Sequence, residues 1–363
     1  MKICMYSPYV PKHLGGGEKY FFDAASALAH DHHVTVVLPR TLTTAEVQDS
    51  QARYERFLNR SLQNITFSVG PLHTGSVIQK LHYTTGFDLC FMVTDGSAFF
   101  SGAKKNIMHI QIPFTTPKVS FLERMKLRSW KVKNANSAFT RTIVEKAWQT
   151  NIQFLHYPAI DEACFQPIQE KETAILNVGR FFRQLHSKRQ DVMVRAFIKL
   201  REAQPELFKG WKLVLVGGIE DEEYTAEVKQ LAMGQPIEFY HGLDRTELLR
   251  WYKRASIYWH ATGFEVNQEE HPECVEHFGI STAEAMASGC VPVVVGKGGQ
   301  TEVLGEPLQH WQWQTTDECV QLTSELLGLP AEQLSALRQT AVTQAKTFSP
   351  ARFQQSLYEM IRL

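Results

Sequence analysis

Two glutamates with seven residues between them stand in a stretch whose residue types suit a phosphorylated sugar. Glu276 and Glu284 bracket the sequence EHFGISTAE, which continues into AMASG and an apolar VPVVV. Ser281 and Glu284 have the spacing of a capping box, so a helix is predicted to begin near Ser281, with Gly289 as its left-handed C-terminal cap. A helix N-terminus suits an anion such as a phosphate, and the carboxylates would bind hydroxyls beside it.

Four cations follow a predicted strand in the second half of the chain. They are Arg180, Arg183, Lys188 and Arg189, in the segment VGRFFRQLHSKRQ, where a helix is predicted to begin at Ser187. Guanidinium groups match phosphate oxygens in pairs, and a lysine acts as a point charge. The segment therefore predicts a diphosphate site.

Two further features of the first half could contact a ligand. The run Gly15–Gly17 opens a predicted helix after the first strand and would let the backbone approach a ligand closely, although a turn without a ligand has the same composition. GGGEKY does not match G-x-G-x-x-G, so NAD or FAD is not expected. His109 lies near the end of a predicted strand, where it could bind a sugar hydroxyl, carry a proton or serve only the core.

Short apolar runs alternate with helical patterns along the whole chain, which predicts parallel sheets covered on both faces. The expected strands are 2–7, 33–38, 65–69, 88–93, 106–111, 135–139, 152–157, 173–179, 211–217, 236–240, 256–261 and 291–296. Each candidate segment follows such a strand, and ligands of these folds bind beyond the carboxyl ends of the strands. We predict an α/β fold with two Rossmann-like doubly wound domains facing across a cleft.

The expected domain boundaries follow from a segment with two prolines and no periodicity, YPAIDEACFQP. It predicts an N-terminal acceptor-side domain over 1–157 and a linker over 158–168. A C-terminal donor domain is then expected over 169–347, with a last helix over 348–363.

Composition indicates a soluble globular protein, because 44% of the 363 residues are hydrophobic and 21% are charged. The sequence has no run of about 18 apolar residues and no signal-peptide pattern at its start. Its six cysteines are scattered, as is typical of reduced cysteines in a cytosolic protein. We expect a cytoplasmic protein.

The net charge of zero hides an asymmetry between the halves of the chain. Residues 1–165 contain 18 lysines and arginines against 12 acidic residues, so the remainder contains 20 against 26. The basic excess is concentrated between Lys118 and Lys146. It indicates either a solvated helix face or a surface for an anionic acceptor or an anionic membrane surface. No nucleic-acid motif accompanies it, so nucleic acid is not an expected partner.

The stretch EHFGISTAEAMASGCVPVV resembles the E-x7-E signature of glycosyltransferase family 4. GGGEKY resembles the glycine loop of that family, and VGR with Lys188 resembles its phosphate-binding Arg/Lys pair. HGLDRTELLRWYKRASIYWHA, VGKGGQTEVL and the helix from Phe348 resemble later segments, so the resemblance covers most of the chain. It implies the GT-B architecture and a retaining glycosyltransferase.

The resemblance also implies roles for the charged residues. Arg180 and Lys188 would hold the donor diphosphate and stabilise the leaving group. The gap between them is longer than is common in the family, which leaves open whether Lys188 or Arg183 is the partner of Arg180. Glu284 would bind the ribose hydroxyls, and Glu276 would contact the donor sugar.

Other implied contacts come from backbone and from the first domain. Backbone N–H groups that would meet the sugar and phosphate belong to Phe278, Gly279 and Ile280. Gly16 and Gly17 would close over the donor, and His109 would touch the donor sugar or the acceptor.

The implied reaction moves a sugar from a nucleoside-diphosphate sugar to an acceptor hydroxyl with retention, without a metal or a cofactor. A glycan or lipid-linked acceptor would place the protein peripherally on the inner membrane face. A sugar-nucleotide epimerase, a phosphorylase and a non-catalytic nucleotide-sugar-binding module are the alternatives. The residues do not name the base, the sugar or the acceptor.

Overall fold

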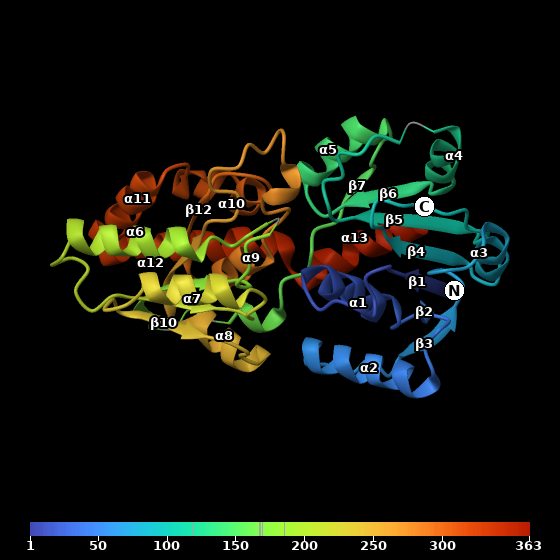
Figure 1. The fold of residues 1–363 in the computed structure, drawn as a ribbon, viewed down its shortest axis with the longest axis horizontal. Coiled ribbons are helices and arrows are strands. Elements are labelled where there is room, and N and C mark those ends of the chain that lie inside the picture. Colours follow the sequence, from blue (N-terminus) through green and yellow to red (C-terminus); the bar gives the residue numbers. More distant parts are fainter. Residues whose placement is uncertain (119, 167, 169, 185) are drawn as a thin grey trace. The chain divides into compact units, whose positions relative to one another are not determined.

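The computed structural model describes residues 1–118, 120–166, 168, 170–184 and 186–363. The chain forms two compact units, shown in Figure 1. Unit 1 contains Met1–Ala159 and Ala351–Leu363, and unit 2 contains Ile160–Pro350. The first division between the units falls inside the expected linker. Pro167, near the end of that linker, and Gln169, where the second domain was expected to start, lie outside the described residues.

Parallel strands form the sheet of unit 1 in the order β3-β2-β1-β4-β5-β6-β7. The strands are Lys2–Tyr6 (β1), His33–Pro39 (β2), Ile65–Gly70 (β3), Leu89–Val93 (β4), Lys105–Ile110 (β5), Val132–Ala135 (β6) and Phe154–Leu155 (β7). The helices are Gly16–Leu28 (α1), Thr44–Leu58 (α2), Val77–Thr84 (α3), Phe121–Ser129 (α4), Ala138–Trp148 (α5) and Pro350–Arg362 (α13).

Both faces of this sheet are buried. In β1, Ile3 and Met5 belong to one hydrophobic cluster, and Cys4 and Tyr6 belong to the other. Successive side chains of a strand point to opposite faces, so a strand covered on both sides must be apolar throughout. This is why a continuous apolar run in the sequence predicts a central parallel strand here.

The last helix of the chain packs on unit 1. Phe353 and Leu357 of α13 join the same cluster as Ile3 and Met5. The carbonyl oxygen of Phe353 lies 3.0 Å from Nε2 of His156, so the return of the chain is also fixed by a polar contact.

Unit 2 repeats this topology with the strand order β10-β9-β8-β11-β12-β13, all parallel. The strands are Glu172–Val178 (β8), Lys212–Val216 (β9), Ile237–Tyr240 (β10), Ala255–His260 (β11), Val291–Val295 (β12) and Gln312–Trp313 (β13). The helices are Gln190–Ala203 (α6), Glu222–Leu231 (α7), Arg245–Arg254 (α8), Ile280–Ala287 (α9), Gln300–Leu308 (α10), Thr316–Gly328 (α11) and Ala331–Ala345 (α12).

In both units the strand order reverses once, between β1 and β4 in unit 1 and between β8 and β11 in unit 2. Loops that leave the carboxyl ends of the two strands at such a switch point diverge to opposite faces of the sheet and leave a crevice for a ligand. In unit 2 these are the loops after Val178 and after His260, which hold most of the candidate residues.

One predicted strand is wrong. Residues 135–139 were expected to form a strand, but β6 ends at Ala135 and α5 begins at Ala138. The hydroxyl of Ser137 accepts a hydrogen bond from the backbone N–H of Thr140 at 3.0 Å, so this serine caps a helix. A helix cap outweighs the apolar run in which it lies.

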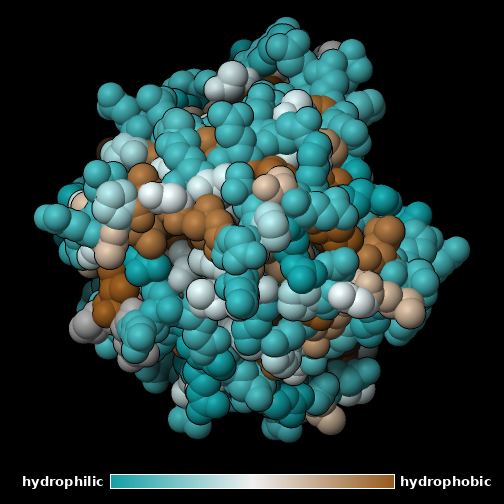
Figure 2. Space-filling view, turned by 90° about the vertical axis from the view of Figure 1, so that its left-hand side faces the viewer, coloured by the Kyte–Doolittle hydropathy of each residue, from teal (hydrophilic) through white to brown (hydrophobic). Residues whose placement is uncertain are grey.

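The surface shows no large continuous apolar area from the direction of Figure 2, where hydrophobic side chains appear as separate areas among hydrophilic ones. Among the described helices, none combines the length and the apolar content that crossing a membrane requires.

Candidate functional site

A buried ion pair joins the two loops at the switch point of unit 2. Nζ of Lys188, in the loop after β8, lies 2.6 Å from Oε2 of Glu276, in the loop after β11. Nε2 of His260, the last residue of β11, lies 3.0 Å from the same oxygen. The lysine and glutamate side chains are 13% and 16% exposed, and the histidine is fully buried.

The charges of this group follow from its surroundings. Burial alone would raise the pKa of Glu276, but the Lys188 ammonium and the hydrogen bond from His260 hold that pKa well below its usual range. Burial lowers the pKa of His260, and the nearby carboxylate only partly opposes this. The group is therefore a carboxylate that accepts hydrogen bonds from an ammonium and a neutral imidazole.

The backbone around Glu276 is held by the glycine turn before α10. The N–H of Gly299 donates to the carbonyl oxygen of Glu276 at 2.8 Å. Gly279 adopts a φ of 112°, and a Cβ placed there would lie 2.7 Å from Nε2 of Gln300. A residue other than glycine would meet both a strained backbone and a steric clash at this point.

The capping box predicted at Ser281 is wrong. Helix α9 begins at Ile280, after Gly279, and no side chain caps it. The hydroxyl of Ser281 accepts a hydrogen bond from the Tyr258 hydroxyl at 2.8 Å instead. Beside this helix start, the fully buried amide of Gln300 has no hydrogen-bond partner at either polar atom. An uncapped helix start next to an unsatisfied buried amide is a suitable place for a ligand anion.

Glu284 is bound by an arginine that the sequence did not single out. Its two oxygens lie 2.6 and 3.1 Å from the guanidinium of Arg245, which also contacts Asp161 at 3.1 Å. The Glu284 side chain is 4% exposed. Burial alone would lower the pKa of Arg245, but Glu284 raises it, so the arginine stays charged. A carboxylate has about four acceptor positions, so a bidentate arginine still leaves some for hydroxyls.

Two of the other predicted cations pair with glutamates outside this group. Nη1 of Arg180 lies 2.8 Å from Oε1 of Glu220, and the Arg180 side chain is 44% exposed. Arg183 pairs with Glu227 of α7 and lies over the ring of Tyr224. The predicted helix start at Ser187 is also wrong, because α6 begins at Gln190 after a left-handed Arg189.

The sequence also gave no sign of His186, which lies next to this group. Its Nε2 is 3.4 Å from Nη2 of Arg180. Burial and the charge of Lys188 lower the pKa of His186 to about 3, so it is neutral near pH 7. A neutral histidine beside two cations can accept or donate a hydrogen bond without adding charge.

In unit 1, the glycine loop lies at the start of α1. Gly16 is the first residue of that helix, and a Cβ on Gly17 would collide with the amide of Gln111, the residue that follows β5. A side chain at position 17 would therefore require the Gln111 amide to move.

His109 of β5 belongs to a buried polar network. Its Nδ1 lies 2.5 Å from Oδ1 of Asn134, and its ring stacks on Tyr20 with ring centroids 3.6 Å apart. The Tyr20 hydroxyl lies 2.5 Å from Nδ1 of His156. Burial lowers the pKa of His109 to about 3, although the bond to Asn134 opposes this. Nε2 of His109 has no hydrogen-bond partner, so one polar atom of the neutral ring is left for a ligand.

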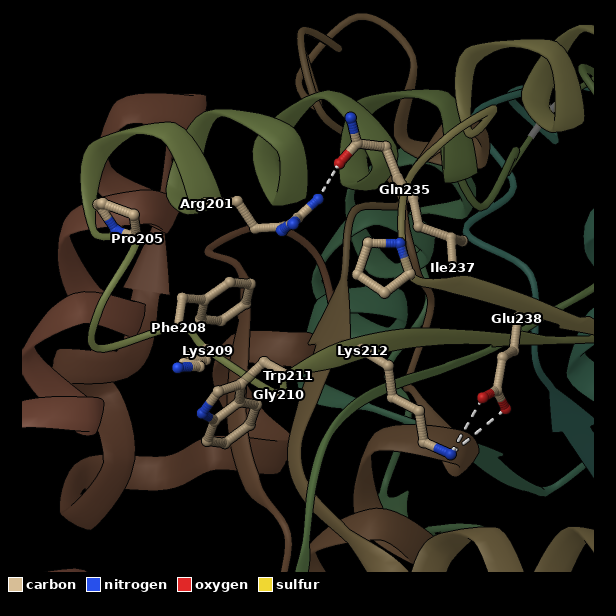
Figure 3. A pocket seen from close by; sticks show the side chains of 11 residues that line it. Arg201, Pro205, Phe208, Lys209, Gly210, Trp211, Lys212, Gln235, Ile237 and Glu238 are labelled. Atoms are coloured by element: carbon tan, nitrogen blue, oxygen red, sulfur yellow. Dashed lines mark hydrogen bonds and ion pairs between the residues drawn. The ribbon is translucent and has the colours of Figure 1, made fainter.

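The candidate residues described above do not line the cavity in Figure 3, and they do not form a metal-binding group. In the described part of the chain, no three or more His, Cys, Asp or Glu side chains are grouped to hold a metal ion. The cavity of about 590 Å³ lies at the amino ends of β9 and β10, where Arg201 donates to Gln235 and Lys212 to Glu238. The candidate residues lie at the opposite, carboxyl ends of the strands.

Comparison with known proteins bears on this site. Residues 161–314 match the family model described as "Glycosyl transferases group 1", and that range includes Lys188, Glu276 and Glu284. The GDP-Man:Man(3)GlcNAc(2)-PP-Dol alpha-1,2-mannosyltransferase of Xenopus laevis is 27% identical over 236 residues, which are 60% of this chain and 46% of that protein. The chain thus spans about half the length of the curated relatives it matches.

Solved structures resemble the chain over its whole length. Anabaena HepE in complex with UDP and glucose has a TM-score of 0.67 at 16% identity and covers 100% of this chain and 99% of its own. A glycosyltransferase from Rickettsia africae has a TM-score of 0.70 at 13% identity, with 99% and 98% covered. These likenesses confirm the predicted fold class of two Rossmann-like doubly wound α/β domains.

Arg245→Ala should lower the free energy of unfolding by about 3–5 kcal/mol, because it leaves the buried Glu284 carboxylate without its counter-charge. Urea denaturation followed by tryptophan fluorescence measures the change. The matched control is Arg254→Ala, which removes the 48% exposed partner of Glu172 and should cost at most about 1 kcal/mol. Equal losses in the two variants would show that the Arg245 pair is not structurally important.

The stability of unit 1 should depend on pH through His109. Between about pH 6.5 and pH 3 the unfolded chain binds a proton at this residue that the folded protein excludes, so stability falls as the pH falls. His109→Gln should reduce that slope by up to about 1.4 kcal/mol per pH unit. Denaturation at a series of pH values measures it, with His30→Gln, an exposed histidine of the same unit, as the control. The same slope in all three proteins would contradict the prediction.

Proposed function

We propose that the protein is a retaining glycosyltransferase of family 4 that moves a hexosyl group from a nucleoside-diphosphate sugar to an acceptor hydroxyl without a metal ion. The observation that carries the proposal is the family-model match over 161–314, because its range holds both the Lys188–Glu276 pair at the switch point and the Glu284 carboxylate bound by Arg245. Two other features support it. They are the uncapped start of α9 and the likeness to a fold solved with UDP and glucose.

The donor diphosphate is held by Arg180 and Lys188 in this proposal. Lys188 already lies 2.6 Å from Glu276, and an ammonium has three donors, so it can keep that contact and still donate to phosphate oxygens. Lys188 is held beside Glu276 at the switch point, which favours Lys188 over Arg183 as the partner of Arg180. The N–H groups around Phe278, Gly279 and Ile280 would add the helix dipole to these charges.

The sugar and ribose are assigned to the two glutamates. Glu284, oriented by Arg245, accepts hydrogen bonds from the ribose hydroxyls. Glu276 accepts from a hydroxyl of the donor sugar and places negative charge near the developing cation. From unit 1, Gly16 and Gly17 give backbone access to the donor, and Nε2 of His109 contacts the donor sugar or the acceptor.

The bond from the anomeric carbon to the diphosphate oxygen breaks, and its electron pair goes to that oxygen. The acceptor hydroxyl oxygen forms the new bond on the same face of the sugar, and its proton passes to the departing phosphate. The cations stabilise the charge that develops on the leaving group, so the step requires no carboxylate nucleophile.

The acceptor is proposed to be a glycan or a lipid-linked sugar, and the site of action the cytoplasm at the inner face of a membrane. The curated relatives carry names with a diphosphate-linked dolichol oligosaccharide, which supports a lipid-linked acceptor. Their names specify a GDP-linked mannose, whereas HepE was solved with UDP, so both bases belong in a donor screen.

The proposal is tested by a panel of nucleoside-diphosphate sugars, followed by analysis of the product. A bound donor at about 100 times its Kd should stabilise the protein by about 2.7 kcal/mol, seen as a rise in melting temperature. NMR of the product with that donor should show the anomeric configuration of the donor. A product with inverted anomeric configuration would refute retention. Donor consumption that requires orthophosphate would indicate a phosphorylase, and epimerisation of the donor without transfer would indicate an epimerase. Binding without any turnover would indicate a binding module.

Glu276→Gln should reduce the rate of transfer by about 100-fold or more, because it removes the negative charge next to the reacting sugar while keeping the hydrogen-bonding shape. The measurement is initial rate with the donor from the screen. Glu273→Gln is the matched control, since this glutamate is in the same loop, 38% exposed and not in contact with Lys188. A Glu276→Gln rate within a few-fold of the control would remove Glu276 from the reaction.

A further inference from the structure

Exposed apolar side chains are concentrated on two helices of unit 1. Among the described residues, eleven large hydrophobic side chains are exposed, and six of them lie on α3 and α4. We call these six the α3–α4 apolar surface: Val77, Ile78, Leu81, Phe121, Leu122 and Met125. The two helices hold only 8 and 9 residues, so the surface is far denser in exposed apolar groups than the rest of the chain. Contiguous exposed apolar groups mark contact sites.

Helix α4 has two apolar sides, and its core side is already occupied. Leu127 is 4% exposed and belongs to the core cluster beneath the helix. Phe121 and Met125, one turn apart, share the opposite side with Leu122, and these three are 77%, 42% and 54% exposed. The outward apolar side of α4 therefore does not serve the fold of unit 1.

Basic side chains flank this outward side. From the start of α4 to Lys131 the chain carries Arg124, Lys126, Arg128 and Lys131 against a single acidic residue, Glu123. The helical spacing of Arg124 and Arg128 places them on one side of the apolar row, and that of Lys126 places it on the other. An apolar row between basic rows matches a surface that is apolar inside and anionic outside.

Helix α3 is linked to the end of α4 through Phe99. Nζ of Lys80, on α3, lies 5.6 Å from the centre of the Phe99 ring, and the indole N–H of Trp130, just after α4, donates to the carbonyl oxygen of Phe99 at 2.8 Å. Burial lowers the pKa of Lys80, and the charge of Lys126 lowers it further, so these two cations are close. Both helices lie at the same end of unit 1 in Figure 1.

We propose that the α3–α4 apolar surface docks unit 1 on an anionic lipid bilayer, with its apolar side chains at the boundary between headgroups and acyl chains. The flanking lysines and arginines would contact the anionic headgroups, and their long stems allow this while the apolar residues insert. Juxtaposed basic residues each add about 1 kcal/mol at such a surface. The purpose of this docking rests on the proposed function, because it would bring a lipid-linked acceptor within reach of the enzyme. The docking itself does not depend on that function.

Charge distinguishes this occupant from a second copy of the chain. A symmetric dimer through the same surface would place the basic residues of α4 against their own copies, and like charges across an interface are unfavourable. An anionic bilayer supplies the opposite charge along the entire surface.

Vesicle binding tests the docking with the full chain. The protein should sediment together with vesicles of phosphatidylcholine and phosphatidylglycerol. The amount of protein that sediments with pure phosphatidylcholine vesicles should be lower by about tenfold or more. The double variant Phe121→Ser with Leu122→Ser should lower binding to the anionic vesicles by about tenfold or more. The double variant Arg128→Glu with Lys131→Glu should do the same and should remove the dependence on phosphatidylglycerol.

The matched control is Met233→Ser with Leu207→Ser, which removes apolar side chains of unit 2 that are 68% and 42% exposed. It should bind vesicles like the unchanged protein, and circular dichroism should show all variants folded. Equal vesicle binding by the Phe121/Leu122 variant and this control would overturn the proposal. It would also be overturned if the unchanged protein and the control were dimers and the Phe121/Leu122 variant alone were a monomer.

Donor binding and turnover with a soluble acceptor separate this proposal from the enzymatic one. The α3–α4 variants should keep the donor-induced rise in melting temperature, because none of the changed residues is assigned to the donor. If no donor in the panel binds but vesicle binding is intact, the proposed enzymatic function is refuted and the membrane-docking proposal stands. If a donor binds but the protein does not bind vesicles, only the membrane-docking proposal is refuted.

Discussion

The candidate site depends on one buried charge, the carboxylate of Glu276. A carboxylate at 16% exposure is costly unless a cation lies beside it, and Lys188 supplies that cation from a loop 88 residues earlier in the chain. The pair therefore ties the loop after β8 to the loop after β11 and fixes where both loops lie at the switch point. His260 adds a hydrogen bond from the end of β11, so the carboxylate is held by side chains from two other segments of unit 2.

The sheets were predictable because their cause is local. A strand covered on both faces must be apolar along its length, so β1, β4 and β12 are visible as runs of residues in the sequence. The starts of helices were less predictable, because the residue spacing of a capping box is short and occurs often in any sequence. Ser281 has the right spacing to Glu284 but its hydroxyl bonds Tyr258, and Ser137, in an apolar run, is the actual cap of α5.

The partners of the predicted site residues could not be read from the sequence, because they come from distant segments. Arg245 reaches Glu284 across 39 positions, and no motif connects them. One local sign existed: Arg245 is the first residue of α8, where a cation opposes the helix dipole. A residue placed against its local preference serves a contact elsewhere, and here that contact is the buried carboxylate of Glu284.

The two cations proposed for the diphosphate differ in how firmly the fold holds them. Arg180 pairs with Glu220 where both side chains are nearly half exposed, and such pairs contribute at most about 1 kcal/mol, so a phosphate can displace Glu220 at little cost. Lys188 pairs with a buried carboxylate that cannot lose its counter-charge without a large penalty. Lys188 is thus fixed before a ligand arrives, whereas Arg180 can exchange one anion for another. A fixed cation defines the position of the phosphate, and an exchangeable one can follow the charge that develops as the bond to the sugar breaks.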